Sequence, residues 1–306
     1  MNHAFTINDS HCHFFSHVFL KAIAGQRFGE GDAVARAIEV LGWESPPQAP
    51  SDLARRWIEE LDRNRVRRSS LIASVPRDED SVAAAVKLFP ERFVGFFMVD
   101  PTQPDALERV GRAVSDLKLR CACFFPAMHR YPLHDERLRR LLDLISKTDG
   151  CAVFVHCGVL TVGIRKKLGL PSSFDFRLGN PLDLSLIVPG YPQTPFIIPH
   201  LGAGFLREAL MAADVCPNIY LDTSSSNSWV RYLGITLREA FRRALAVAGP
   251  GRLLFGTDSS FFPRGWQRSI LDEQLTILSE LKVGPSDTAA ILGGNFDRLF
   301  PVSRSE

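Results

Sequence analysis

Two histidines near the start of the chain have the side-chain type and the spacing of metal ligands. His11 and His13 stand two positions apart in the segment DSHCHFF. Side chains two residues apart on an extended strand point to the same face, so both imidazoles can reach one ion. The pair also fits ordinary polar residues at the end of a strand, and its meaning depends on what the rest of the chain offers.

Three further polar residues stand at equivalent places, each at the end of a short apolar run. His156 ends CAVFVH, His200 ends FIIPH and Asp258 ends LLFGTD. In a parallel barrel the carboxyl ends of the strands share one face, where active sites are built. One histidine after one strand is usually a hydrogen-bonded structural residue. The coincidence of several such residues with the first pair instead predicts a metal site on that face.

Eight short runs rich in β-branched and aromatic residues must carry these side chains, and the runs alternate with amphipathic stretches. Most of them are continuously apolar, as expected of strands that are buried on both faces. The predicted strands are residues 5–11, 70–75, 93–99, 119–125, 152–156, 196–200, 219–223 and 253–258.

The stretches between the strands have the periodicity of helices. Leu53, Trp57, Ile58 and Leu61 recur at the 3.6-residue spacing. Further helices are predicted at residues 107–117, 138–145, 205–215, 237–248 and 270–281. Eight strands with intervening helices predict an α/β fold, a (β/α)8 TIM barrel, in one domain over residues 1–306. An open Rossmann sheet fits less well, since the chain has no G-x-G-x-x-G or P-loop motif.

Two connections are longer than a barrel needs, and we expect long loop insertions after the first and fifth strands. The first covers residues 14–51 and ends in SPPQAP, and the second covers residues 158–195 and contains RKKLGLPSSFDFRLGNP. Both follow strands, so both should lie over the catalytic face of the barrel, where long loops often act as lids or binding loops.

Composition excludes several classes of protein. The 36 basic and 34 acidic residues are spread along the chain and give a formal net charge of +2, which predicts no nucleic-acid partner. Arg65, Arg67 and Arg68 are expected to be solvated helix ends. The N-terminal segment lacks the apolar run of a signal peptide or membrane helix, so we expect no membrane partner and a cytoplasmic location. The six cysteines are expected to be reduced core thiols.

The pattern of polar residues resembles the amidohydrolase superfamily. In that family strand 1 carries H-x-H, strands 5 and 6 each end in His, and strand 8 ends in Asp. The resemblance extends over nearly the whole chain and is closest to the branch with aminocarboxymuconate semialdehyde decarboxylase, aromatic-acid decarboxylases and pyrone dicarboxylate lactonase. Supporting segments are YPLHDERLRRLLDLI, NPLDLSLI and ILGGNFDRLF.

The resemblance implies a role for each of the five polar residues. It makes His11, His13, His156 and Asp258 ligands of a metal ion. It makes His200 an acid/base that holds the water beside the metal and exchanges a proton near neutral pH. Asp258 would also accept a proton. Catalysis would therefore depend on His200 and Asp258.

The number of metal ions depends on the fourth predicted strand. Binuclear relatives place a bridging carboxylated Lys or a Glu there, whereas this chain reads RCACFFPAM without Lys, Glu or Asp. We therefore predict one divalent ion. Three imidazoles and a carboxylate suit Zn2+, and Mn2+ is the alternative. Cys123 falls where a Lys often stands in this branch, and it is either a thiolate ligand or a residue of the core.

The substrate-binding residues are predicted from their place in the loops alone. Cationic side chains that follow strands can bind a carboxylate with two hydrogen bonds, and aromatic rings can form a wall for a planar substrate. Each of these residues also fits a plain surface or packing role. The predicted set is Arg77, Arg130, Arg177 and Trp229, with His129, Arg264, Phe14, Phe15 and Phe125 as further members.

Two related reactions fit this site. The first is hydrolysis of a carboxylate-bearing lactone, ester or amide through metal-activated water, which we favour because the polar segment DTSSSNS leaves room for water. The second is non-oxidative decarboxylation of an aromatic or muconate-type acid, favoured by the aromatic HFF and CFFP segments. A catalytically silent metal-binding barrel is a third interpretation. The resemblance also implies a homodimer.

Overall fold

The computed structural model describes residues 5–224 and 228–302, and its strands form one sheet in which every ladder is parallel. Along the sheet β1 pairs with β3, each later strand pairs with the next in the chain, and β2 pairs beside β1 on β3. In the described residues the strands are β1 (Ile7–Asp9), β2 (His13–Phe14), β3 (Val66–Ala73), β4 (Phe93–Val99), β5 (Cys121–Phe124), β6 (Ala152–Val155), β7 (Phe196–Ile198), β8 (Ile219–Asp222) and β9 (Leu253–Leu254).

The last strand returns to the first, so the sheet closes into a barrel. Ser10 N–H donates to the carbonyl of Phe255 at 2.8 Å, and Asp258 N–H donates to the carbonyl of His11 at 2.9 Å. An isolated parallel bridge joins Cys12 to Ser259. The predicted (β/α)8 TIM barrel and its eight predicted strands are therefore confirmed, with the first strand divided into β1 and β2.

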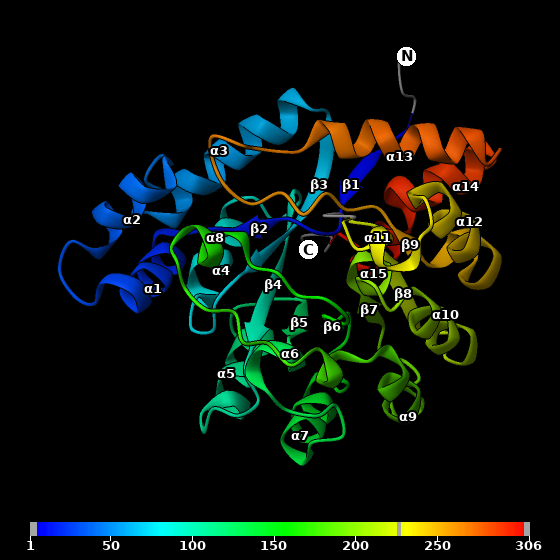
Figure 1. Cartoon of the computed structure of the whole chain (residues 1–306), viewed down its shortest axis with the longest axis horizontal. Coiled ribbons are helices and arrows are strands. Elements are labelled where there is room, and N and C mark those ends of the chain that lie inside the picture. The colour runs from blue at the N-terminus through cyan, green and yellow to red at the C-terminus, as the bar shows by residue number, and fades with distance from the viewer. Residues whose placement is uncertain (1–4, 225–227, 303–306) are drawn as a thin grey trace.

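Helices surround the strands along the chain (Figure 1). The longer ones are α1 (His17–Phe28), α2 (Ala33–Leu41), α3 (Pro50–Arg63), α4 (Glu79–Leu88), α5 (Ala106–Ser115), α7 (Glu136–Ile145), α10 (Leu206–Val215), α12 (Leu237–Ala248) and α13 (Arg268–Glu280). The shorter ones are α6 (Pro126–His129), α8 (Gly163–Lys167), α9 (Leu184–Ile187), α11 (Val230–Leu233), α14 (Pro285–Ala289) and α15 (Asn295–Leu299). No helix within the described ranges combines the length and the apolar character that crossing a bilayer requires.

Alternation along the strands divides the core into an inner and an outer layer. On β4, Phe96 and Met98 belong to the cluster inside the barrel, whereas Phe97 and Val99 belong to the cluster shared with the surrounding helices. Both layers are apolar because each strand has the barrel interior on one side and helices on the other. This explains why the sequence of the strands is continuously apolar.

The amino-terminal end of the barrel is closed by α15 and by one buried arginine. Phe296 and Phe300 pack into the inner cluster. Arg68 on β3 is 2% exposed and donates to the Asp297 carboxylate at 2.6 Å and to the carbonyl of Phe300 at 2.7 Å. The expectation that Arg68 is a solvated helix end is wrong, because its side chain points into the barrel and neutralises a carboxylate there.

The two long connections are folded into helices and share a core of their own. The first contains α1 and α2, and the second contains α8 followed by short helical turns. Phe19, Ile23 and Leu41 from the first connection cluster with Ile164 and Leu168 from the second. We call α1, α2 and α8 the cap. The cap is a helical unit, so these connections differ from the loop insertions that the sequence analysis expects.

Candidate metal centre

Three of the predicted ligands meet at the carboxyl ends of the first and last strands. The Nε2 atoms of His11 and His13 are 3.3 Å apart. The Oδ1 atom of Asp258 lies 3.1 Å from Nε2 of His13 and 3.6 Å from Nε2 of His11. The three donor atoms all lie within 4.8 Å of one another, which is the spacing of ligands around one cation.

Hydrogen bonds on the far side of both imidazoles hold the rings so that their Nε2 atoms face each other and the Asp258 carboxylate. Nδ1 of His11 lies 2.6 Å from the Asp222 carboxylate, and Nδ1 of His13 lies 2.7 Å from the Ser74 hydroxyl. A carboxylate on the second ring nitrogen fixes the orientation of a metal-ligating histidine. The sequence analysis missed Asp222, although the residue stands at the end of a predicted strand as Asp258 does.

The charges around these residues suit a cation. Burial lowers the pKa of His13 and favours its neutral form, which is the form that binds metal. Burial also acts on His11, but the neighbouring Asp222 and Asp258 carboxylates outweigh it and raise the pKa of His11. For Asp258, burial opposes ionisation, yet the hydrogen bond from His13 and the charge of His11 bring its pKa below the ordinary range. Asp258 is therefore a carboxylate.

His156 lies at the edge of this group, on the side of β6. Its ring stacks on Phe125 with centroids 5.4 Å apart, and it lies 5.3 Å from the ring of His200. Burial and the nearby imidazoles lower the pKa of His156 well below its usual range. Its Nδ1 atom is buried and has no hydrogen-bond partner among the described residues. A neutral, buried and partly unpartnered imidazole is suited to a metal, but the three-residue group above does not include it.

His200 faces the same centre from β7, with its ring 4.9 Å from that of His11. Its Nδ1 lies 3.0 Å from the carbonyl oxygen of Ser224, and the Ser224 hydroxyl lies 3.1 Å from the same Nδ1 and 2.9 Å from Nδ1 of His11. Burial lowers the pKa of His200. Ser224 thus connects two predicted site residues, whereas the sequence had singled out only the polar segment DTSSSNS to which it belongs.

The backbone at two site residues is in a rare conformation. His200 has φ 54° and Asp258 has φ 58°, in the left-handed region that residues with a side chain seldom adopt. Such conformations are found mainly where a function requires a particular side-chain direction. Both residues are the polar ends of apolar strands, so the turn of the backbone aims their side chains across the mouth of the barrel.

Two glycines allow the loops of the site to approach each other. Gly256 lies two residues before Asp258, and a Cβ atom there would lie 2.8 Å from the Asp222 carboxylate and 2.9 Å from Cβ of His11. Gly158 lies two residues after His156, has φ +77°, and a Cβ atom there would collide with the carbonyl oxygens of Gly202 and Ala203. The close approach therefore requires glycine at both positions.

The site opens on the side of His13 and Asp258. Their side chains are 19% and 26% exposed, whereas that of His11 is 2% exposed. Next to this opening the ring of Phe15 lies 5.7 Å from that of His13. Metal and substrate must enter from this side.

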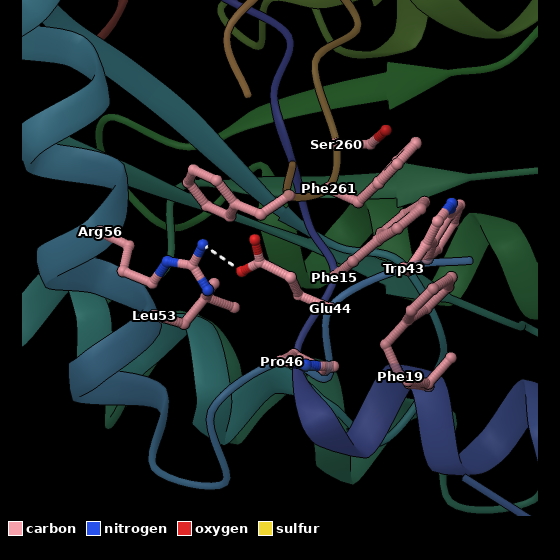
Figure 2. Close-up of a pocket in the computed structure, with 11 residues that line it drawn as sticks. Phe15, Phe19, Trp43, Glu44, Pro46, Leu53, Arg56, Ser260 and Phe261 are labelled. Atoms are coloured by element: carbon pink, nitrogen blue, oxygen red, sulfur yellow. Dashed lines mark hydrogen bonds and ion pairs between the residues drawn. The ribbon is translucent and has the colours of Figure 1, made fainter. Parts of the chain in front are cut away.

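A stack of aromatic rings connects the opening to the cap. Trp43 stacks on Phe261 with centroids 3.7 Å apart, and Phe15 stacks on Phe19 at 3.9 Å. Figure 2 shows these rings lying face to face around a pocket, beside the ion pair of Glu44 and Arg56. The pocket encloses about 20 Å³, which is room for about one water molecule. As it stands, this pocket is packing between the cap and the barrel.

The other predicted substrate residues lie in varied surroundings. Arg77 pairs with Asp105 at 2.7 Å, and the side chain of Arg177 is 90% exposed and pairs with Asp175 at 2.7 Å. Arg130 donates to the carbonyl of Ser173 at 2.8 Å. Their role in substrate binding stays a prediction.

Trp229 and Cys123 are both buried. Trp229 is 3% exposed and belongs to the outer core, although its indole N–H has no partner among the described residues. Cys123 on β5 belongs to the inner core beside Phe154, with which it is in register on the neighbouring strand. These surroundings favour the packing interpretation of Cys123 over a thiolate ligand. Residues 225–227 of the segment DTSSSNS lie outside the described residues.

The chain resembles several known proteins. Protein fluG of Emericella nidulans is 28% identical over 169 residues, which are 54% of this chain and 18% of that protein. The matched segment thus spans less than a fifth of that relative. The 5-carboxyvanillate decarboxylase of Novosphingobium aromaticivorans, in complex with manganese and 4-hydroxy-3-methoxy-5-nitrobenzoic acid, has a TM-score of 0.66 at 15% identity, over 97% of this chain and 96% of that chain.

A second solved structure is a probable 2-pyrone-4,6-dicarboxylic acid hydrolase of Acinetobacter baumannii with citric acid bound. Its TM-score is 0.60 at 14% identity, over 96% of this chain and 99% of that chain. At such identities the two structures show the shared fold alone. The sequence itself matches the Amidohydrolase family over residues 9–302. Because that match runs over nearly the whole length, the chain belongs to the Amidohydrolase family.

Proposed function

We propose that this chain is a metal-dependent hydrolase that acts on a small lactone, ester or amide bearing a carboxylate. Family and fold support an enzyme of the hydrolase or decarboxylase class over a catalytically silent barrel. The choice of hydrolysis depends on the hydrogen bond between Nδ1 of His200 and the carbonyl oxygen of Ser224.

The residues present fit one divalent ion. The Nε2 atoms of His11 and His13 and a carboxylate oxygen of Asp258 would hold it, and His156 would complete a set of three imidazoles and one carboxylate. The fixed Nδ1 contacts of His11 and His13 support this, since ligating imidazoles need their second nitrogen engaged. Such a set suits Zn2+, with Mn2+ as the alternative. When bound, the ion would polarise an oxygen of the substrate and make water more acidic.

His200 is arranged to accept a proton. The carbonyl oxygen of Ser224 accepts a hydrogen bond when His200 carries its hydrogen on Nδ1, and in that tautomer Nε2 carries the lone pair; the Ser224 hydroxyl, 3.1 Å from Nδ1, fits either tautomer. With its ring between His11 and His156, that lone pair can take a proton from a water molecule that attacks a carbonyl carbon. Decarboxylation of an aromatic acid instead needs a protonated group that delivers a proton to a ring carbon, and the lowered pKa of His200 disfavours its protonated form. The tautomer of His200 therefore supports hydrolysis.

Asp258 has a part beside His200. Its carboxylate is ionised and partly exposed at the opening, where it can orient water by accepting a hydrogen bond, while the proton that His200 takes from the water would go on to the leaving group. The left-handed backbone conformation of both residues keeps their side chains directed at the same space.

Decarboxylation is the second candidate, and the aromatic surroundings favour it. Phe154 lies 5.3 Å edge-on to His11, and Phe125 stacks on His156. Rings at this distance make a dry floor that suits a planar acid and the departure of carbon dioxide. Phe125 and Phe154 belong to the interior of the barrel and leave the His13 side open, so they do not specify the reaction.

The direct test follows the oxygen and the carbon of the substrate. Purified protein loaded with Zn2+ or Mn2+ is incubated with 2-pyrone-4,6-dicarboxylate, carboxylate esters and hydroxybenzoates in water enriched in oxygen-18. We expect the label in the product carboxylate, no carbon dioxide, and activity that a chelator abolishes. Release of carbon dioxide from a hydroxybenzoate without incorporation of label would overturn the proposal.

A further inference from the structure

One arginine touches the metal centre directly through the backbone of a predicted ligand. Nη2 of Arg264 donates to the carbonyl oxygen of Asp258 at 3.0 Å and to the Ser260 hydroxyl at 2.6 Å. These two bonds use the two hydrogens of Nη2. A guanidinium has five N–H donors, so the three on Nε and Nη1 are available, and within residues 5–224 and 228–302 none of them has a protein partner.

The charge of Arg264 is also free to meet a ligand. Arg77 and Arg177, which share its place after a strand, are each paired with an aspartate. The ion pairs of the described chain do not include Arg264, an exposed residue that reaches the backbone of Asp258. When Asp258 binds a metal ion, its carboxylate is not available to pair with Arg264. The positive charge of Arg264 is then suited to a negative group on the substrate.

The guanidinium lies against an aromatic surface that holds it in place. Its central carbon is 5.0 Å from the centroid of the Phe261 ring. Trp43 stacks on the same Phe261 ring. An arginine that is stacked and hydrogen-bonded at one end loses little conformational freedom when it binds a planar anion. Phe261 thereby offers an apolar surface next to the charge.

We propose that Arg264 binds the carboxylate of the substrate at the entrance of the metal site, with Ser260 and the Asp258 carbonyl fixing its orientation. The inference rests on the proposed function and adds the residue that selects for the negative charge. A hydrogen bond from Nη1 and the positive charge of the guanidinium would hold the carboxylate, and the rest of the molecule would extend past Asp258 toward His200. Arg264, and not Arg77, Arg130 or Arg177, would then be the main arginine that binds the substrate.

The test is a binding titration that requires no turnover. The metal-loaded protein is titrated with 4-fluorobenzoate and with the uncharged 4-fluorobenzamide, and dissociation constants are read from fluorine NMR. We expect the wild type to prefer the benzoate. Arg264→Met should raise the Kd for the benzoate about tenfold or more and leave the Kd for the benzamide nearly unchanged. Arg264→Lys should restore part of the affinity, because it keeps the positive charge but not the planar group that stacks on Phe261.

Two control measurements separate this role from a structural one. Arg268→Met removes an exposed arginine four residues away that pairs with Asp272, and it should leave both constants unchanged. Metal content and melting temperature of Arg264→Met should equal those of the wild type. Equal benzoate affinity in Arg264→Met and wild type, or no preference of the wild type for the benzoate, would overturn the proposal. Failure of hydrolysis with intact benzoate selectivity would remove only the proposed reaction.

Discussion

The buried polar groups at the two ends of the barrel differ in the partners that the chain provides for them. At the amino-terminal end, Nη1 of Arg68 donates to Asp297 and to the carbonyl of Phe300 beneath the ring of Phe296, although its Nε has no partner among the described residues. At the carboxyl-terminal end, His11 and His13 are held at Nδ1 while their Nε2 atoms lie 3.3 Å apart and face the Asp258 carboxylate. Polar groups satisfied by the chain contribute to stability, and polar groups left converging are available for a ligand.

The comparison predicts its largest effect at the open end. A His11→Ala/His13→Ala double variant removes two of the converging nitrogens, and bound metal should fall from about one ion per chain to less than about a tenth. Activity should fall by at least ~10³-fold with it. Elemental analysis of purified protein measures the stoichiometry. A wild-type value near two, or undiminished metal in the double variant, would contradict the single-ion site.

A smaller effect is expected at the proton acceptor beside the metal. His200→Asn keeps a polar side chain near Ser224 but removes the basic nitrogen, so turnover should fall by about 10²-fold while metal content stays near that of the wild type. Steady-state kinetics and elemental analysis on the same preparation separate the two quantities. Loss of metal would make His200 a ligand, and unchanged turnover would exclude it from the reaction.

At the closed end a substitution should change stability without changing the site. Arg68→Met leaves the Asp297 carboxylate without its buried partner and should lower the free energy of unfolding by about 2 kcal/mol. Arg67→Met is the matched control, because Arg67 pairs with the same aspartate from an exposed position and should change stability by less than about 0.5 kcal/mol. Urea unfolding measures both, with metal content as the reference. Equal losses for the two variants would show that burial of Arg68 contributes nothing.

The smallest expected effect is on the pH dependence of stability, and it comes from a third buried group, Asp78, which lies after β3 beneath the cap. Its carboxylate accepts a hydrogen bond from the Ser16 hydroxyl at 2.7 Å, while Oδ1 has no partner among the described residues. Burial, aided by the charges of Glu79 and Asp80 and opposed by hydrogen bonds, raises the pKa of Asp78 from 3.8 to about 6. The folded state therefore binds the proton more tightly than the unfolded state.

It follows that Asp78 costs stability as the pH rises through this window from about 4 to about 6. Asp78→Asn has no proton to lose. Its free energy of unfolding relative to the wild type should therefore be larger at pH 8 than at pH 5, by on the order of 1 kcal/mol. Melting temperatures of both proteins at the two pH values measure this difference. Asp80→Asn, at an exposed ion pair, is the control and should show no such trend. A difference between Asp78→Asn and wild type that is independent of pH would disprove the linkage.

Sequence patterns predict the strands well because burial on both faces leaves a signal in every residue of a strand. They also bring His11, His13 and Asp258 together, since parallel strands end on one face. The single domain, the catalytic roles and the homodimer stay predictions. Arg68 was misjudged because a basic cluster says nothing about which of its members faces the interior of a barrel.

What sequence could not supply depends on contacts between distant segments. Asp222 and Ser224 acquire their importance from bonds to histidines on other strands, and the bond from Ser224 to His11 joins residues 213 positions apart. The choice among arginines is of the same kind, because Arg264 differs from Arg77 only in the partners that the fold gives it. The helices of the cap were not predicted because the connections that contain them also hold Pro-rich segments such as SPPQAP, which resemble loops, although α1 and α2 themselves contain no proline.

The close packing around Gly256 has a consequence for how this site can vary among related sequences. A methyl group there would press on Asp222 and His11 together, and so would displace a ligand without altering any ligating atom. In a library of all single substitutions scored by activity, Gly256 should therefore be as intolerant as the histidines, and Gly158 likewise. In such a library, a glycine that tolerates no substitution would therefore identify the edge of the active site as clearly as the ligating histidines do.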